Sequence, residues 1–221
     1  MTINIGFQMD PLESLSLEDD TTIAIIEECL SRDYNIWHFL PKDVSYINGE
    51  VMASSKIILE LNKDIQPGFK TSDLIRKNLK ELDLIFLRQD PPFDMSYITS
   101  TFLLEYIEDE VKIINKPSEV RNAPEKLFLN RWKNLTPETI ITKNISEINS
   151  FRKKHKNIIL KPLYGNGGNG IFFLGEKDKN FNSLIEIFLD THPEQFILQE
   201  YLKNIKFGDK RIILINGKPE G

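Results

Sequence analysis

The sequence contains little cysteine and no long apolar segment, and each absence excludes a class of protein. Cys29 is the only cysteine in 221 residues, so no disulfide can form within the chain, which fits a reducing compartment. No apolar run approaches the roughly 18 residues that a membrane-spanning helix needs. The first ten residues lack a basic region followed by an apolar stretch, so no secretory signal is apparent. We therefore expect a cytoplasmic protein without a membrane partner.

A strong charge of one sign is also missing. Charged residues make up 28% of the chain and hydrophobic residues 40%, a composition typical of a folded protein. The net charge of −5 argues against a nucleic-acid partner. His38, His155 and His192 do not have the spacing of metal ligands, so the sequence predicts no zinc site.

Strand and helix patterns alternate in the N-terminal third of the chain. Ile3–Met9 and Leu82–Leu87 are short apolar runs, and a helix that Asp20 or Thr21 can cap follows the first run. Further strands are expected at Asn35–Leu40 and Val111–Ile114, and a hairpin turn at Asn48-Gly49. This alternation predicts an α/β fold with a doubly wound parallel sheet.

Polar residues follow the ends of several predicted strands. Asp10 follows the first strand, Arg88 and Asp90 follow Leu82–Leu87, and Asn115 follows the last strand of the group. Doubly wound sheets bind ligands beyond the carboxyl ends of their strands. An arginine there suits a substrate carboxylate. A surface loop with a satisfied Arg–Asp pair is the alternative interpretation.

The segment Ile158–Leu174, IILKPLYGNGGNGIFFL, combines a lysine with a cluster of glycines. Lys161 follows an apolar run, and a second apolar run follows the glycines Gly165, Gly167, Gly168 and Gly170. Glycines reach positive φ and let backbone N–H groups converge on an anion. The pattern predicts two antiparallel strands joined by a flap that covers a polyphosphate.

Two other phosphate-binding motifs fail in the same segment. The glycines match G-x-G-x-x-G, but that motif must open a helix, and the apolar run Ile171–Leu174 follows instead. The P-loop needs a lysine and a hydroxyl after its last glycine, and Ile171 and Phe172 occupy those positions. An ordinary glycine-rich hairpin stays open as an alternative.

A second lysine lies in a predicted helix start, Asn122–Leu129. Asn122 is the expected cap, Glu125 follows three residues later, and Pro124 lies near the first turn. Lys126 would then project from the first turn, where a cation opposes the helix dipole. A nearby anionic ligand would explain this placement, and an exposed, solvated lysine is the alternative.

Eight sequence blocks together resemble a known family, in the family's order. They are MDP, YINGE, LRQDPPFD, NKPSEVRNAPEKLF, LTPETIIT, IILKPLYGNGGNGIF, QEYL and GDKRI. The chain resembles the amino-terminal two-thirds of a prokaryotic-type glutathione synthetase, an ATP-grasp ligase. The lysines, the glycine flap and QEYL carry the ATP-grasp likeness, and DPPFD and NKP carry the likeness to glutathione synthetase.

The resemblance implies roles for ten residues in ATP binding. Lys126 and Lys161 would reach the phosphates, the flap amides would cover them, the hinge Glu200–Leu202 would receive adenine through its backbone, and Asp209 would lie near the ribose. The implied ATP-binding set is Lys126, Lys161, Gly165, Gly167, Gly168, Gly170, Glu200, Tyr201, Leu202 and Asp209. Asp10, Arg88 and Asp90 are carried over as substrate candidates, and no catalytic residue is assigned.

The implied reaction joins γ-glutamylcysteine to glycine at the expense of ATP and Mg²⁺, through an acyl phosphate. A pre-ATP-grasp domain that contributes to substrate binding and subunit packing is expected at residues 1–122. The small ATP-grasp subdomain with the flap is expected at 123–203, and the start of an incomplete large subdomain at 204–221. The resemblance also implies a homo-oligomer.

The chain departs from the family at its end. The family's Mg²⁺ ligands, an acidic pair and an asparagine, are expected beyond residue 221, so none is predicted within this chain. Asn216-Gly217 predicts a hairpin turn with too few residues after it for a normal returning strand. We therefore expect the chain alone to be an inactive fragment of a ligase. Another ATP-grasp carboxylate–amine ligase, or a non-catalytic nucleotide-binding module, remain the alternative functions.

Overall fold

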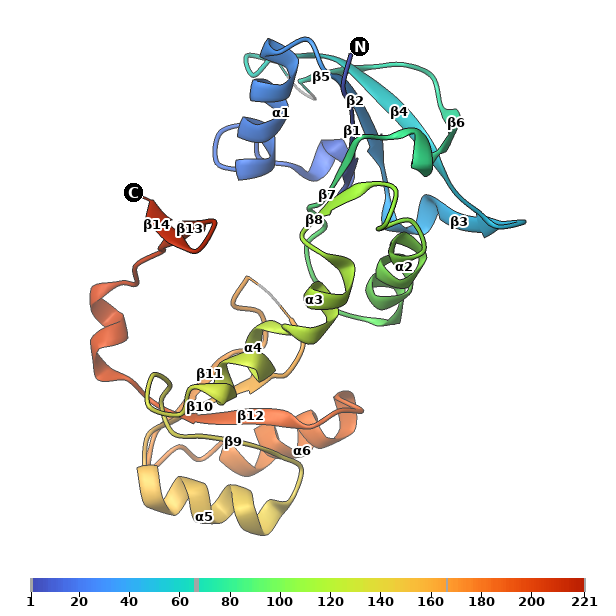
Figure 1. Ribbon diagram of the computed structural model, residues 1–221. Coiled ribbons are helices and arrows are strands. Elements are labelled where there is room, and N and C mark those ends of the chain that lie inside the picture. Colours follow the sequence, from blue (N-terminus) through green and yellow to red (C-terminus); the bar gives the residue numbers. More distant parts are fainter. Residues whose placement is uncertain (1, 66–67, 166, 221) are drawn as a thin grey trace. The chain divides into compact units, whose positions relative to one another are not determined.

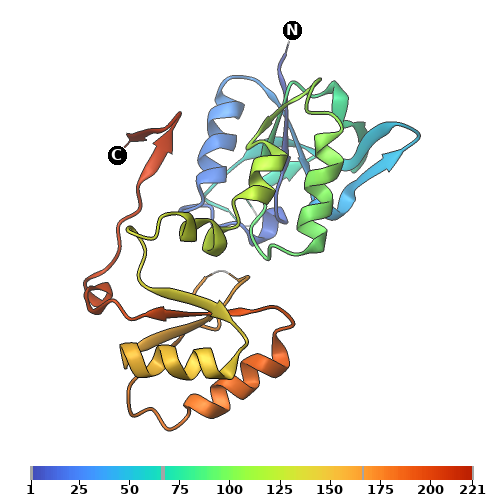
Figure 2. The same ribbon diagram turned by 60° about the horizontal axis from the view of Figure 1, so that its bottom comes forward.

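The computed structural model describes residues 2–65, 68–165 and 167–220, which divide into two compact units. The first unit comprises Met1–Phe128 together with Tyr164–Asn166, and the second comprises Leu129–Leu163 together with Gly167–Gly221. Figure 1 and Figure 2 show the course of the chain through both. Within the described ranges, no helix has the length and apolar character needed to cross a bilayer.

A mixed sheet forms the centre of the first unit. Its described strands run in the order β3-β4-β2-β1-β7-β8, and β5 and β6 also pair with β4. The parallel strands are β1 (Asn4–Gln8), β2 (Asn35–Phe39), β7 (Leu84–Leu87) and β8 (Lys112–Ile114). The antiparallel strands are β3 (Val44–Ile47), β4 (Glu50–Leu61), β5 (Phe69–Thr71) and β6 (Ile75–Asn78).

Helices cover both faces of this sheet. Successive strand residues point to opposite faces, so Phe7 joins a core with Ile26 of α1 (Thr21–Ser31). Ile85 joins a separate core with Leu104 of α2 (Met95–Glu105). A short helix, α3 (Pro117–Asn122), follows β8. The predicted doubly wound arrangement is therefore confirmed for the parallel strands, whereas the antiparallel extension through β5 and β6 was not predicted.

Two local signals in the first unit have the predicted geometry. The Asp20 side chain accepts a hydrogen bond of 2.7 Å from the Thr22 N–H and so caps α1. Asn48 and Gly49 have φ of 52° and 92°, the left-handed values that a two-residue hairpin turn requires, and they join β3 to β4. Both predictions are confirmed.

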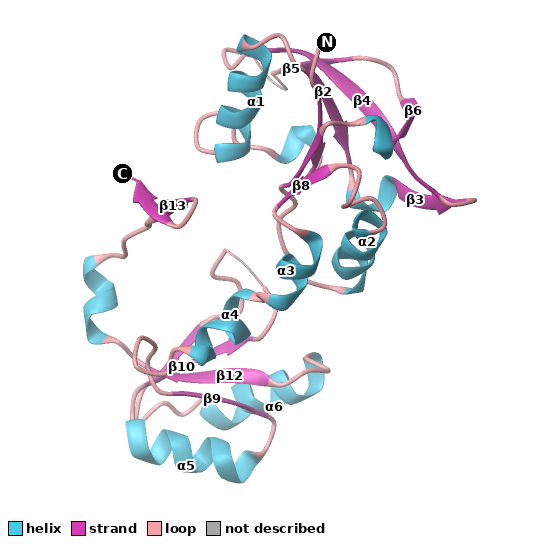
Figure 3. Ribbon diagram, viewed as in Figure 1, coloured by secondary structure: helices cyan, strands magenta, loops and turns pink. Residues whose placement is uncertain are grey.

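The second unit contains a smaller antiparallel sheet with helices on one face, as Figure 3 shows. Its described strands, in the order β11-β10-β12-β9, are β9 (Thr139–Thr142), β10 (Ile158–Pro162), β11 (Phe172–Leu174) and β12 (Phe196–Glu200). The helices α5 (Ile145–His155) and α6 (Phe181–Thr191) contribute Phe151 and Phe188 to one core with Leu160 and Leu198. Because strand side chains alternate, Lys161 and Gln199 project from the other face.

Short elements complete the chain, and two predictions about them are wrong. The helix α4 (Glu125–Phe128) begins after Pro124, whereas Asn122 is the last residue of α3 and does not cap a helix. The strand β13 (Ile213–Ile215) does have a returning partner, the short strand β14 (Lys218–Glu220). The short 3₁₀ segments are η1 (Leu12–Ser14), η2 (Pro41–Asp43), η3 (Leu79–Glu81), η4 (Leu129–Arg131) and η5 (Lys203–Phe207).

Candidate active site

The predicted strand-end residues of the first unit lie at one edge of its sheet. The strands β1, β7 and β8 are parallel, so their carboxyl ends meet there. The Asp10 carboxylate accepts a hydrogen bond of 2.6 Å from the Asp90 N–H, which ties the loop after β1 to the loop after β7. The sequence therefore placed Asp10 and Asp90 together correctly.

Arg88 belongs to the same edge but does not form the surface Arg–Asp pair that was the alternative interpretation. Its backbone N–H donates to the Gln8 carbonyl at 2.8 Å. Its guanidinium donates to the hydroxyls of Thr21 and Thr22, at 2.7 and 3.0 Å, at the start of α1. These bonds hold a half-buried cation at the carboxyl end of the sheet.

The charges at this edge perturb one another. Partial burial, and then the charges of Asp10 and Asp20, raise the pKa of the Asp90 carboxyl, against an opposing effect of Arg88. Burial, followed by the Asp10 and Asp90 charges, raises the pKa of the Tyr97 phenol. Two carboxylates beside a cation and a neutral phenol can bind a ligand that carries both an ammonium and a carboxylate group.

A buried amide network supports this edge, and the sequence analysis did not single it out. Gln8 is fully buried at the end of β1; its side-chain amide donates to Gln89 and, at 3.2 Å, to the Ser100 hydroxyl of α2. The network fixes the residue between Arg88 and Asp90. The sequence feature that could have indicated this network is Gln8, a polar residue inside the apolar run Ile3–Met9.

Lys126 is not the solvated surface lysine of the alternative interpretation. Its side chain in α4 is only 12% exposed, and its ammonium donates a hydrogen bond of 2.6 Å to the carbonyl of Gly165. The Glu125 carboxylate lies 3.9 Å from this ammonium. The buried stem of Lys126 thus carries its ammonium to the first flap glycine.

The glycine flap joins antiparallel strands, as predicted. The strands β10 and β11 pair with Ile158 opposite Leu174. Gly167, Gly168 and Gly170 have φ of 60°, 76° and 71°, values that side chains disfavour. A Cβ on Gly168 would meet nothing within 4 Å, whereas one on Gly170 would lie 3.2 Å from Pro162. The flap is thus open on one side and anchored near its end; Asn166 lies outside the described residues.

Lys161 projects from the face of the small sheet opposite α5 and α6. Its ammonium donates to the Gln199 side chain at 3.0 Å, and the Gln199 amide donates in turn to the Thr139 hydroxyl at 2.8 Å. This chain of bonds crosses three neighbouring strands, β10, β12 and β9. Gln199 is part of the QEYL block but received no role from the sequence.

The predicted hinge begins in a strand. Glu200 is the last residue of β12, and its N–H donates to the Glu138 carbonyl at 2.9 Å, while the Tyr201 N–H donates to Asn157 at 3.2 Å. Leu202 follows directly, before η5. Asp209 lies on an exposed loop after η5, and the structure does not bring it into contact with the hinge. These hydrogen bonds thus fix the backbone of Glu200 and Tyr201, whereas Asp209 lies outside the hinge.

The described residues offer no magnesium site. Among them, no group of three or more His, Cys, Asp or Glu side chains is arranged to hold a metal ion. Mg²⁺ requires carboxylate oxygens in near-octahedral geometry, so these residues do not fit the ion and no chemical step is assigned to it here.

Solved ATP-grasp structures share the fold of this chain. The D-alanyl-alanine synthetase A of Vibrio cholerae aligns with a TM-score of 0.59 over 99% of this chain and 66% of its own, at 12% identity. A RimK domain ATP-grasp protein of Sphaerobacter thermophilus aligns with a TM-score of 0.57 over 90% of this chain and 64% of its own, also at 12% identity. At such identities the similarity supports the fold alone.

Sequence relatives are much more similar. The glutathione synthetase of Agrobacterium fabrum is 44% identical over 218 residues, which cover 99% of this chain and 68% of that protein. The Escherichia coli O6:H1 glutathione synthetase is 36% identical, covering 98% and 69%. This chain therefore spans about 70% of the length of these curated relatives.

Family models match nearly the whole chain in two consecutive parts. The N-terminal domain of prokaryotic glutathione synthetase matches residues 3–121. The ATP-grasp domain of prokaryotic glutathione synthetase matches residues 125–221. With these matches and with relatives above 40% identity, the chain belongs to the prokaryotic glutathione synthetase family.

Proposed function

We propose that the protein is an ATP-dependent ligase that joins γ-glutamylcysteine to glycine and forms glutathione. The terminal carboxylate of γ-glutamylcysteine attacks the γ-phosphorus of ATP, and ADP leaves. The glycine amine then attacks the resulting acyl phosphate, loses a proton, and expels inorganic phosphate as the amide bond forms. Such phosphoryl transfer depends on positioning and charge neutralisation more than on covalent chemistry by the protein.

The observation that carries this proposal is the hydrogen bond from Lys126 to the first flap glycine, Gly165, in a chain of the glutathione synthetase family. We propose that Lys126 and Lys161 neutralise the ATP phosphates, and that the amides of Gly165, Gly167, Gly168 and Gly170 cover them. The positive φ of the last three glycines supports this role, because such backbone lets N–H groups converge on an anion.

We propose that the hinge binds adenine through its backbone and that Asp209 lies near the ribose. The N–H groups of Glu200 and Tyr201 are bonded within the protein, whereas the Leu202 N–H has no acceptor among the described residues. The Leu202 N–H is therefore the donor available to an adenine nitrogen. For Asp209 to reach the ribose, the exposed loop that carries it would have to move toward the bound nucleotide.

We propose that the strand-end edge receives γ-glutamylcysteine. Arg88 would bind a carboxylate of this dipeptide, and the Asp10–Asp90 pair would face its ammonium group, as the charges of that edge favour. In this proposal residues 1–122 form the substrate and subunit-packing domain, 123–203 the small ATP-grasp subdomain, and 204–221 the start of the large one. The family-model boundary between 121 and 125 supports the first division.

Membership of an ATP-grasp family implies ATP and Mg²⁺ use, and we propose that the Mg²⁺ ligands lie in the part of the relatives' length that this chain does not span. We further propose a cytoplasmic homo-oligomer that binds neither nucleic acid nor a membrane, which the net charge of −5 supports. This chain alone would then turn over little or not at all.

The test is a product assay on the protein at the full length of its relatives and on this chain. Both are incubated with ATP, Mg²⁺, γ-glutamylcysteine and glycine, and glutathione and ADP are measured by mass spectrometry. The proposal expects equal amounts of glutathione and ADP from the full-length protein, and neither product when one substrate is omitted. This chain alone should give background amounts.

The two alternative functions give different results in the same assay. Another ATP-grasp ligase would produce ADP only with a different carboxylate and amine, and no glutathione. A nucleotide-binding module would bind ATP without forming ADP under any combination of substrates. Either result would overturn the proposal.

A further inference from the structure

A pocket of about 180 Å³ lies in the first unit. It opens between η1, the end of β2 and the middle of β4, and its polar lining comes from Glu13, His38, Asp43, Ser54 and Lys56. An apolar cavity of about 150 Å³ holds one benzene molecule, so this pocket has room for a ligand of similar size.

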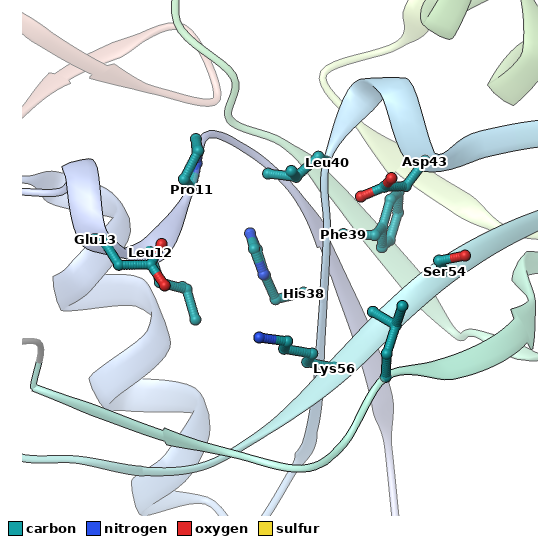
Figure 4. Close-up of a pocket in the computed structure, with 10 residues that line it drawn as sticks. Pro11, Leu12, Glu13, His38, Phe39, Leu40, Asp43, Ser54 and Lys56 are labelled. Carbon is teal, nitrogen blue, oxygen red and sulfur yellow. The ribbon is translucent and has the colours of Figure 1, made fainter.

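Charged groups of opposite sign line this pocket without pairing with one another. Within the described ranges, the Lys56 ammonium forms no ion pair or hydrogen bond, and the carboxylates of Glu13 and Asp43 form none either. Figure 4 shows the His38 ring and the Lys56 side chain directed into the space that Leu12 and Glu13 bound from the side of η1. Separated charges that do not neutralise each other suit a ligand that itself carries both signs.

His38 gives this pocket a fixed polar group. The ring is only 7% exposed, and one ring nitrogen, Nε2, lies 3.2 Å from the Asp10 carbonyl. Burial lowers the pKa of His38, with Lys56 acting in the same direction and Glu13, Asp43 and the Asp10 bond opposing it. The ring is therefore neutral near pH 7; Nε2 donates to the carbonyl, and Nδ1 is left as an acceptor.

We propose that this pocket binds a small zwitterionic α-amino acid. The ligand carboxylate would pair with the Lys56 ammonium, and its ammonium would donate to His38 Nδ1 and the Glu13 carboxylate. The site does not depend on ATP binding, and its residues are distinct from the strand-end group proposed for γ-glutamylcysteine.

The hydrogen bond from His38 to the Asp10 carbonyl connects the pocket to the strand-end edge. Asp10 in turn accepts the Asp90 N–H, so a ligand that fixes the His38 ring also restrains the loop after β1. Because these hydrogen bonds connect the pocket to the strand-end edge, the pocket is suited to sensing an amino acid. It does not supply a reacting group.

The test uses the three histidines of the chain as reporters. The full-length protein is labelled with ¹³C-histidine and titrated with L-alanine, which is neither proposed substrate, and the ring signals are followed by NMR after assignment through a His38→Gln variant. We expect the His38 signal to shift and saturate at millimolar concentrations, while the His155 and His192 signals stay in place. An unmoved His38 signal would overturn the proposal.

Single-charge probes and variants test the charge pattern. Acetate and ethylammonium should each bind at least about tenfold more weakly than alanine, and equal binding of acetate would show a simple anion site and contradict the proposal. Lys56→Gln and Glu13→Gln should each weaken alanine binding about tenfold, whereas Lys42→Gln, an exposed lysine of η2 outside the pocket, should leave it unchanged. Unaltered binding in both pocket variants would also refute it, and thermal unfolding of each variant would show that it folds.

Discussion

The strand-end edge of the first unit and the glycine flap are organised in opposite ways. At the edge, side chains are already bonded to the protein: Asp10 to the Asp90 N–H, and Arg88 to two threonines. In the flap, backbone dominates, and Gly168 has open space where a side chain would stand. One region holds charges in fixed positions, and the other leaves open space beside its backbone.

This difference matches what each region is proposed to bind. A dipeptide has to be recognised by its charges, so its site benefits from groups that bonds hold in place before binding. A polyphosphate is surrounded on several sides, so its cover has to admit it and then close, which glycine backbone permits. In the proposal, Lys126 and Lys161 would add positive charge to the phosphate site.

The largest expected effect comes from removing a proposed phosphate ligand. Lys161→Met should lower the rate of ADP formation by the full-length protein about 10²- to 10³-fold, the usual loss for one well-placed electrostatic stabiliser. Steady-state kinetics and ATP binding by calorimetry measure it. The matched control is Lys153→Met, an exposed lysine of α5. Comparable rates of ADP formation for the two variants would show that Lys161 is not part of the ATP site.

A smaller and different effect is expected at the strand-end edge. Arg88→Met should raise the KM for γ-glutamylcysteine about 10- to 100-fold with little change in the KM for ATP, because hydrogen bonds to charged groups contribute about 1.5–3 kcal/mol. Arg32→Met, which removes an exposed arginine paired with Glu28, is the control. An equal rise in both KM values would indicate general disruption, and thermal unfolding of the variant would check this.

Two alanine substitutions separate the anchored end of the flap from its open part. Gly170→Ala and Gly168→Ala both force a side chain to positive φ, at about 1–2 kcal/mol each. Gly170→Ala should cost more, because its Cβ also approaches Pro162 to 3.2 Å. Urea unfolding of the two variants measures the difference. A larger loss at Gly168 would contradict the packing described for the flap.

The smallest expected effect is a change in folding stability caused by the Asp90 carboxylate. The folded-state pKa of Asp90 is raised above its ordinary 3.8, so its contribution to stability is complete below pH 3.8 and is lost as the pH rises through the raised pKa. Asp90→Asn should therefore be more stable than the parent near pH 7, by less than about 0.5 kcal/mol at this exposed site. The Asp90 N–H bond to Asp10 remains in the variant.

Thermal unfolding of both proteins over a range of pH tests this sign. The stability difference should shrink as the pH falls toward 3.8 and vanish below it. A variant less stable than the parent near pH 7 would mean that Asp90 makes a favourable charge interaction instead.

Local patterns in the sequence predicted much of the fold and part of the site. The cap at Asp20, the Asn48-Gly49 turn and the flap strands depend on neighbouring residues, and these predictions are confirmed. Asn122 was misassigned because the capping pattern N-x-x-E also fits the end of α3. The Gln8–Gln89–Ser100 network and the Lys161–Gln199 bond join residues distant in sequence, so only strand register could reveal them.

The measurement that tests the central claim most directly follows an oxygen atom. The full-length protein is supplied with ATP, Mg²⁺, glycine and γ-glutamylcysteine labelled with ¹⁸O in its terminal carboxylate, and the released phosphate is analysed by mass spectrometry. The account predicts one ¹⁸O atom in each phosphate, because that oxygen bridges the acyl phosphate and leaves with phosphorus. Unlabelled phosphate released together with glutathione would contradict it.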